Sequence, residues 1–158
     1  MMIAHASLPA DDPERVAHVL AEIMDGEALP FPPGGPQCWM AWSGDEAIEL
    51  EIVPRGRMMA PDDADGGNWR AAHPEAPRAS EAHLAIAVRK PMSAIMEIAR
   101  REGWRTGEYD RGGFFRLAEV WVENAFLIEF LDPAQTAAYK ASMTRANWKK
   151  TFGLGAAA

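Results

Sequence analysis

The feature that most constrains this chain is a weak internal repeat, in which equivalent segments lie 78 residues apart. In the first copy, residues 3–8 have the character of a strand, and Asp12-Pro13 then opens a helical pattern. In the second copy, residues 82–88 have the same character and Lys90-Pro91 opens the helix. Asp is a favoured N-cap, and Pro is tolerated at the first helical position. The repeat therefore predicts two copies of one strand–helix unit.

Each predicted helix is followed by β-rich sequence. Strands are predicted at residues 28–31, 37–42 and 46–53, and at residues 104–109, 114–122 and 125–131. Gly, Asp and Asn between the apolar runs are typical of hairpin turns. The fold class predicted is therefore α+β, with two tandem βαβββ modules that form a curved mixed sheet around a concave ligand cavity.

The domain boundaries follow from this repeat. The first module takes residues 1–53 and the second takes residues 80–132, and together they form one domain. Residues 54–79 are rich in Pro, Asp, Gly and Ala without sustained periodicity, so we expect a linker or a surface loop. Residues 133–158 are expected to form a C-terminal helix to about residue 144 and a solvated tail that includes Arg145, Lys149 and Lys150.

Composition excludes several classes of partner. With 16 basic and 23 acidic residues the formal net charge is −7, which argues against nucleic acid as a partner. No apolar run approaches the length of a membrane span, and the amino terminus lacks the pattern of a secretory signal. Cys38 is the single cysteine, so no intramolecular disulfide can form. We therefore expect a cytoplasmic protein with no membrane and no nucleic-acid partner.

Each module carries one histidine in its first predicted strand and one glutamate in its last. His5 and Glu51 are 46 residues apart, as are His83 and Glu129. Strand alternation places all four on the side opposite the residues that would pack on the helices, toward the concave side. Mixed imidazole and carboxylate ligation suits Mn, Fe, Co, Ni or Zn and leaves positions for a pair of substrate oxygens. Glu49 lies on the same face as Glu51 and is an alternative ligand.

This pattern resembles the vicinal oxygen chelate superfamily, which includes glyoxalases, bleomycin resistance proteins and extradiol dioxygenases. The resemblance covers residues 2–133 and is carried by "IAHASL", "AIELEIVP", "EAHLAIAV" and "FLIEFLDP" around His5, Glu51, His83 and Glu129. It implies a divalent metal held by these four residues, with Glu51 or Glu129 as a general base. It also implies a small-molecule ligand and a homodimer.

Three functions are compatible with these sequence features. Only the first of them would make the protein an enzyme. The first is a metal-dependent lyase, isomerase or dioxygenase acting on a small substrate with vicinal oxygens. The second is a metal-free module that sequesters a small, cationic molecule, with the histidines as hydrogen-bonded scaffold, and the third is a non-catalytic dimeric module. Arg111 and Arg116 flank a predicted turn, where they either meet an anionic substrate or lie exposed. The sequence does not decide whether the four ligands come from one chain or two.

Overall fold

The first module is a four-stranded mixed sheet covered by one helix. The computed structural model describes residues 5–57, 59–62, 66–69, 80 and 82–152. The elements of the first module are β1 (Ala6–Ala10), α1 (Pro13–Ile23), β2 (Ala28–Pro30), the short 3-10 helix η1 (Pro32–Gly34), β3 (Trp39–Trp42) and β4 (Glu49–Pro54). The strand order is β1-β4-β3-β2, with β1 parallel to β4 and the other pairs antiparallel.

The second module repeats this arrangement. Its elements are β7 (Leu84–Ala87), α2 (Met92–Arg101), β8 (Arg105–Asp110), β9 (Arg116–Val122) and β10 (Phe126–Leu131). The strand order β7-β10-β9-β8 matches that of the first module, and β7 is again parallel to the last strand. The predicted α+β fold of two βαβββ modules is therefore confirmed.

The core lies between each sheet and its helix. Leu50 and Ile52 of β4 and Ile128 and Phe130 of β10 are at most 2 % exposed, and they alternate with the glutamates of the same strands. Because neighbouring side chains of a strand point to opposite faces, the glutamates lie on the face away from the helices. Strand alternation thus fixes the face on which both candidate carboxylates lie.

The start of α1 also follows from its sequence. The Asp12 side chain accepts a hydrogen bond from the Arg15 backbone N–H at 3.1 Å, and Pro13 is the first helical residue. In the second module Pro91 occupies the N-cap position and makes no side-chain hydrogen bond there. Helix α2 therefore begins at Met92, one residue later than the start predicted at Pro91.

The structure differs from the sequence expectation in two segments. The predicted linker contains an antiparallel hairpin of β5 (Met59–Asp62) and β6 (Gly66–Trp69), and β4 extends into it as far as Pro54. After α3 (Pro133–Ser142), the expected solvated tail instead forms a second helix, α4 (Arg145–Thr151). Thr144 caps this helix by accepting a hydrogen bond from the Asn147 N–H at 3.2 Å. Residues 153–158 and residues 3–4 lie outside the described part.

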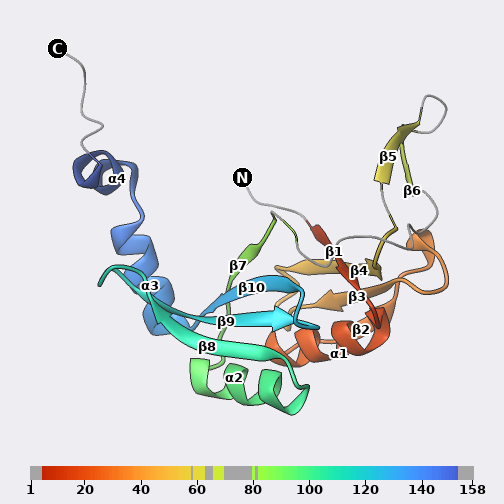
Figure 1. The fold of residues 1–158 in the computed structure, drawn as a ribbon, viewed down its shortest axis with the longest axis horizontal. Helices are drawn as coiled ribbons and strands as arrows, with labels where there is room; N and C mark the ends of the chain where they lie inside the picture. Colours follow the sequence, from red (N-terminus) through yellow and green to blue (C-terminus); the bar gives the residue numbers. More distant parts are fainter. Residues whose placement is uncertain (1–4, 58, 63–65, 70–79, 81, 153–158) are drawn as a thin grey trace.

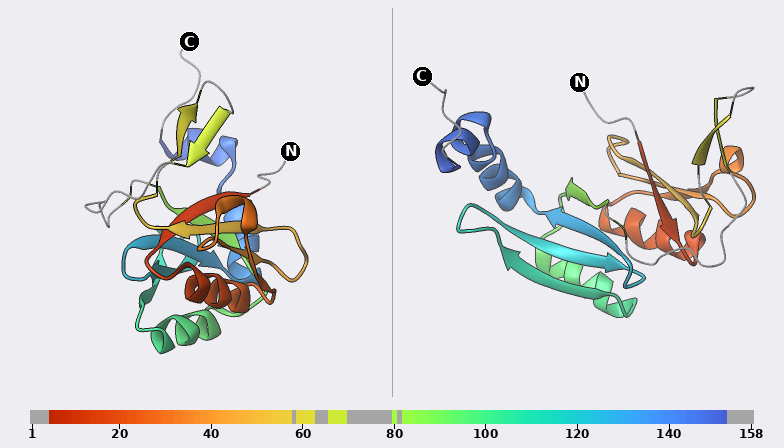
Figure 2. Two further views of the ribbon diagram at one scale, coloured as in Figure 1. Left: turned by 90° about the vertical axis from the view of Figure 1, so that its right-hand side faces the viewer. Right: turned by 45° about the horizontal axis from the view of Figure 1, so that its top comes forward.

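Helices α1 and α2 lie on one side of the sheets, and the β5–β6 hairpin and the α3–α4 segment lie on the other. Figures 1 and 2 show α1 and α2 on one side of the two modules, while the β5–β6 hairpin and the α3–α4 segment project from the other side at the two ends of the molecule. No helix among the described residues is both long enough and apolar enough to cross a membrane.

The turn between β9 and β10 joins the two modules. The backbone N–H groups of Asp11 and Asp12, which precede α1, donate to the Glu123 carboxylate at 2.5 and 2.7 Å. Arg55 also donates to Glu123 at 3.2 Å and pairs with the Asp11 carboxylate at 2.6 Å. The side chains of Arg55 and Glu123 are only 10 % and 13 % exposed, so this is a partly buried junction.

Candidate functional site

The structure brings His5 and Glu51 together. Glu51 lies beside Ser7 in the parallel register of β1 and β4, and the Ser7 hydroxyl donates to Glu51 Oε2 at 2.6 Å. The other carboxylate oxygen, Oε1, lies 3.7 Å from His5 Nε2. The Glu51 side chain is 12 % exposed and that of His5 is 54 % exposed. The predicted pair of the first module is therefore a mostly buried carboxylate beside an accessible imidazole.

Glu49, the alternative ligand, lies two residues earlier on the same face and is paired with Trp42 of β3. Glu49 and His5 both line a small pocket of about 210 Å³, whose other wall is β7. Glu51 has the direct contact with His5, so the geometry favours Glu51 as its partner, while Glu49 faces the gap between the modules.

Glu129 of the second module is held by an arginine. Arg111 Nη2 donates to Glu129 Oε1 at 2.6 Å and to Glu119 Oε1 at 2.7 Å. Glu119 and Glu129 are direct partners across β9 and β10, and the Trp121 indole N–H donates to Glu119 Oε2 at 3.3 Å. The hydrogen bonds to Glu119 and then Glu129 raise the pKa of Arg111, so it remains a cation.

Glu119 was not among the site residues predicted from the sequence. A signal for it was present, because Glu119 is a carboxylate in an otherwise apolar strand, RLAEVWV, as Glu129 is in FLIEFL. Arg111 was expected either to meet an anionic substrate or to lie exposed. In the structure it pairs with two glutamates and is 34 % exposed.

His83 lies just before β7 and is exposed. The register gives Glu129 the partner Ala85, where the first module gives Glu51 the partner Ser7. In the part of the chain that the structure describes, no three or more His, Cys, Asp or Glu side chains are grouped so that they could hold a metal ion. The four-residue metal site therefore stays a prediction, with His5 and Glu51 in contact and His83 and Glu129 on the second module.

Comparisons with known proteins identify the fold. No family model and no curated protein sequence matches the chain. Among solved structures, the fosfomycin resistance protein FosX of Listeria monocytogenes, in complex with Mn(II) and sulfate, superposes with a TM-score of 0.56 at 13 % identity, over 88 % of this chain and 95 % of that one. FosX of Mesorhizobium loti gives 0.54 at 15 %, over 87 % and 96 %. A putative glyoxalase family protein of Bacillus anthracis gives 0.52 at 18 %, over 82 % and 93 %.

This chain has the vicinal oxygen chelate fold. At identities of 11–18 %, the likeness establishes the fold and leaves the reaction to be argued from the residues of the chain itself. The fold inferred from four short motifs is thus confirmed.

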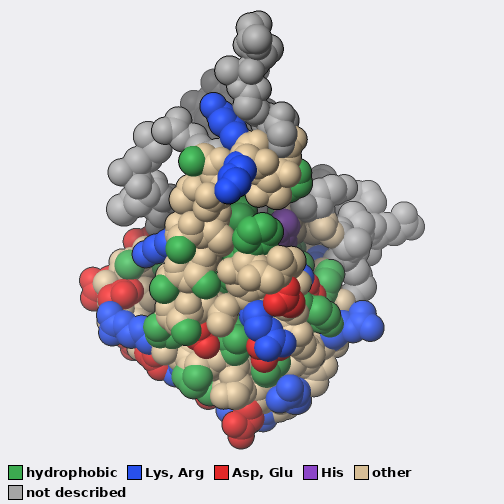
Figure 3. Space-filling view, turned by 90° about the vertical axis from the view of Figure 1, so that its left-hand side faces the viewer, with side chains coloured by type: hydrophobic (Ala, Val, Ile, Leu, Met, Phe, Trp, Pro, Cys, Tyr) green, Lys and Arg blue, Asp and Glu red, His purple; other side chains and the backbone are tan. Residues whose placement is uncertain are grey.

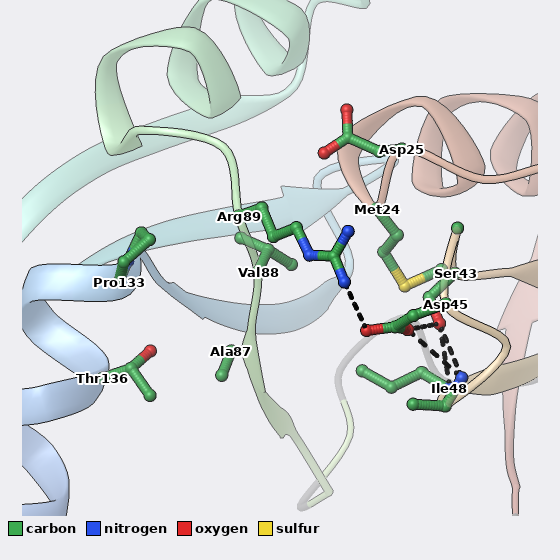
Figure 4. Close-up of a pocket in the computed structure, with 12 residues that line it drawn as sticks. Met24, Asp25, Ser43, Asp45, Ile48, Ala87, Val88, Arg89, Pro133 and Thr136 are labelled. Carbon is green, nitrogen blue, oxygen red and sulfur yellow. Dashed lines mark hydrogen bonds and ion pairs between the residues drawn. The ribbon is translucent and has the colours of Figure 1, made fainter.

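A larger pocket of about 440 Å³ lies at a second junction of the two modules (Figure 4). Arg89, which follows β7, reaches across to Asp45 in the turn between β3 and β4, at 3.3 Å. Lys90 also pairs with Asp25 at the end of α1. Asp45 is equivalent to Glu123 in the repeat, and each of the two hairpin turns contacts the other module. The contact of Asp45 with Arg89 is open to solvent.

A third pocket, of about 490 Å³, lies between the β8–β9 turn and the α3–α4 segment. Four exposed hydrophobic side chains line it: Phe114, Met143, Trp148 and Phe152. Figure 3 shows this end of the molecule, where hydrophobic side chains lie among Lys and Arg. Arg111 is part of the wall, so the pocket adjoins the ion pair with Glu129.

Proposed function

We propose that this protein holds a divalent metal, one of Mn, Fe, Co, Ni or Zn, with His5, Glu51, His83 and Glu129. It would act as a glyoxalase-type lyase, isomerase or dioxygenase on a small substrate with vicinal oxygens. The observation that carries the proposal is the His5–Glu51 pair, in which the two groups lie 3.7 Å apart on the sheet face opposite the helices. An imidazole and a carboxylate at this separation are two of the donors that such metals take.

The donor set fits a site made of two halves. Since no group of three donors is gathered among the residues described within one chain, we propose that a second copy of the chain completes the site. His5 and Glu51 of one copy would then face His83 and Glu129 of the other. The exposure of both histidines supports this, because each imidazole is accessible to a partner. The protein would therefore work as a homodimer.

The residues of the first half-site suit proton transfer. A bound divalent metal would polarise the oxygens of the substrate. Ser7 holds one oxygen of Glu51, which leaves Oε1 free to face His5 and an adjoining substrate. Glu51 would remove a proton from the substrate carbon next to a carbonyl group and return it, as a general base and acid. Glu129 is less suited to this step because Arg111 already engages one of its oxygens.

Metal content and oligomeric state test this proposal together. Untagged protein purified without chelator is analysed for Mn, Fe, Co, Ni and Zn beside His5→Ala, His83→Ala and Glu129→Gln, and its mass is measured by light scattering. We expect near-stoichiometric metal in a dimer, with loss of the metal in all three variants. Screening of α-oxoaldehyde, epimerase and dioxygenase substrates would follow. A parent protein that neither contains nor takes up metal would overturn the proposal.

A second candidate function is metal-free binding of a small cationic molecule. The observation in its favour is that the Arg111 guanidinium lies against Glu129, where the first proposal needs a metal. The net charge of −7 adds to the attraction for a cation. A rise in melting temperature with cationic drug-like ligands, and none with divalent metals, would favour this candidate.

A further inference from the structure

One side-chain nitrogen bridges two carboxylates in the second module. Arg111 Nη2 is 2.6 Å from Glu129 Oε1 and 2.7 Å from Glu119 Oε1, so both oxygens are directed at the same point. Both glutamate side chains are 16 % exposed. Two partly buried carboxylates this close repel each other unless a cation lies between them. Arg111 supplies that cation from within the chain.

The first module has a different environment at the equivalent carboxylate. Glu51 lies across from Met40 of β3, whereas Glu129 lies across from Glu119 of β9. The groups in contact with Glu51 are the Ser7 hydroxyl and the His5 imidazole. The two half-sites thus offer a carboxylate open to a metal on one module and a carboxylate already paired with a cation on the other.

We propose that Arg111 competes with the metal for Glu129, so that the protein sets its own metal affinity. This inference rests on the proposed function, since it concerns the same site. A divalent metal that binds Glu129 Oε1 would compete with the guanidinium, because two cations that approach the same oxygen repel each other. The free energy of the ion pairs that are broken is subtracted from that of metal binding, which lowers the apparent affinity.

The surroundings of Arg111 permit this competition. Its side chain is 34 % exposed, so the guanidinium has a path to solvent. The Tyr109 ring centre lies 6.0 Å from the guanidinium carbon, so the ring is a cation–π partner for Arg111 beside the carboxylates. Arg111 is followed by Gly112 and Gly113, with φ of 67° and 77°, values that suit glycine. Arg111 thus lies in the β8–β9 turn at the edge of the site, with one side open to solvent.

Titration of metal-free full-length protein with Mn²⁺ by calorimetry tests the inference. Arg111→Gln is expected to bind Mn²⁺ about 10- to 100-fold more tightly than the parent. Changes next to metal ligands usually weaken metal binding by this factor, and here the sign is reversed because the group removed is a competing cation. Arg116→Gln is the matched control. It removes the same charge from the same hairpin but breaks a pair with Glu108, 3.0 Å away. The control is expected to match the parent within about twofold, because exposed ion pairs have little effect on other sites.

Thermal unfolding gives a second readout. Without metal, Arg111→Gln is expected to melt below the parent, because Glu119 and Glu129 then repel each other. Saturating Mn²⁺ should raise its melting temperature by more than it raises that of the parent. Arg111→Lys retains the charge and protects folding, and its Mn²⁺ affinity should fall between those of Arg111→Gln and the parent, since an ammonium replaces the guanidinium less than fully.

The outcomes separate this inference from the proposed function. If the parent binds Mn²⁺, loses it in Glu129→Gln, and both Arg111 variants bind no more tightly than the parent, the inference is overturned and the metal proposal stands. If the gain in Arg111→Gln disappears when Glu129→Gln is added, the competition at Glu129 is supported. If the parent and all Arg111 variants bind none of Mn²⁺, Fe²⁺, Co²⁺, Ni²⁺ and Zn²⁺ in the same titration, both proposals are overturned.

Discussion

The two modules share a backbone plan and differ in the chemistry placed on it. In each, the first strand is parallel to the last, and a glutamate of the last strand faces away from the helix. In the first module that glutamate, Glu51, is next to Ser7 and His5. In the second it is Glu129, which Arg111 holds together with Glu119. The difference comes from a few positions, which shows how a duplicated framework can keep its register while its two half-sites diverge.

The contacts between the modules differ in the same way. The β9–β10 turn places Glu123 against two backbone N–H groups and Arg55, with both side chains at most 13 % exposed. The equivalent β3–β4 turn places Asp45 against Arg89, with side chains 49 % and 76 % exposed. One junction is therefore a partly buried network, and the other is a solvent-exposed ion pair beside a pocket. We expect the first to stabilise the packing of the modules and the second to contribute little.

The largest effect is expected from Glu123→Ala. The change removes the acceptor of two backbone N–H groups and leaves Arg55 with one partner fewer, so we expect a loss of roughly 2–3 kcal/mol in the free energy of unfolding. Urea denaturation measures it. Glu46→Ala is the control, because Glu46 is exposed and also has a positive φ, 56° against 50° for Glu123. An equal loss in both variants would attribute the effect to the replacement of Glu at a positive φ and not to the junction.

An intermediate effect is expected from Ser7→Ala, which gives the first module the residue that the second has at Ala85. The loss of one hydrogen bond to Glu51 should reduce the free energy of unfolding by about 0.5–1 kcal/mol. If Glu51 binds a metal, losing the bond that orients it should also weaken Mn²⁺ binding about tenfold.

The reciprocal change, Ala85→Ser, is the control for Ser7→Ala. It adds a hydroxyl beside Glu129, where Arg111 already engages the carboxylate, and we expect Mn²⁺ affinity to change less than in Ser7→Ala. Calorimetry of both variants compares them directly. Equal effects would mean that the two half-sites do not differ in the way their contacts indicate.

Local patterns predicted the fold and the face of each carboxylate. The alternation in FLIEFL places Glu129 opposite Ile128 and Phe130, and Asp12-Pro13 predicts the start of α1. The pairing of Glu119 with Glu129 could not be predicted from the sequence, because it depends on the register between β9 and β10. The contact of Arg111 with both carboxylates depends also on the direction of the β8–β9 turn. The β5–β6 hairpin and α4 were missed because both occur in polar segments that lack a sustained apolar period.

The smallest effect is expected from Arg89→Gln at the open junction. The hydroxyl of Ser43 and then the backbone N–H of Ala47 are the main causes that lower the pKa of Asp45, and Arg89 contributes less. The ion pair is also 3.3 Å long and well exposed, so its loss should change the free energy of unfolding by no more than experimental error. An NMR titration of Asp45 should show a pKa that stays below its ordinary value in the variant. A destabilisation as large as that of Glu123→Ala would mean that both junctions hold the modules together equally, because the exposed pair would then be contributing as much as the partly buried network.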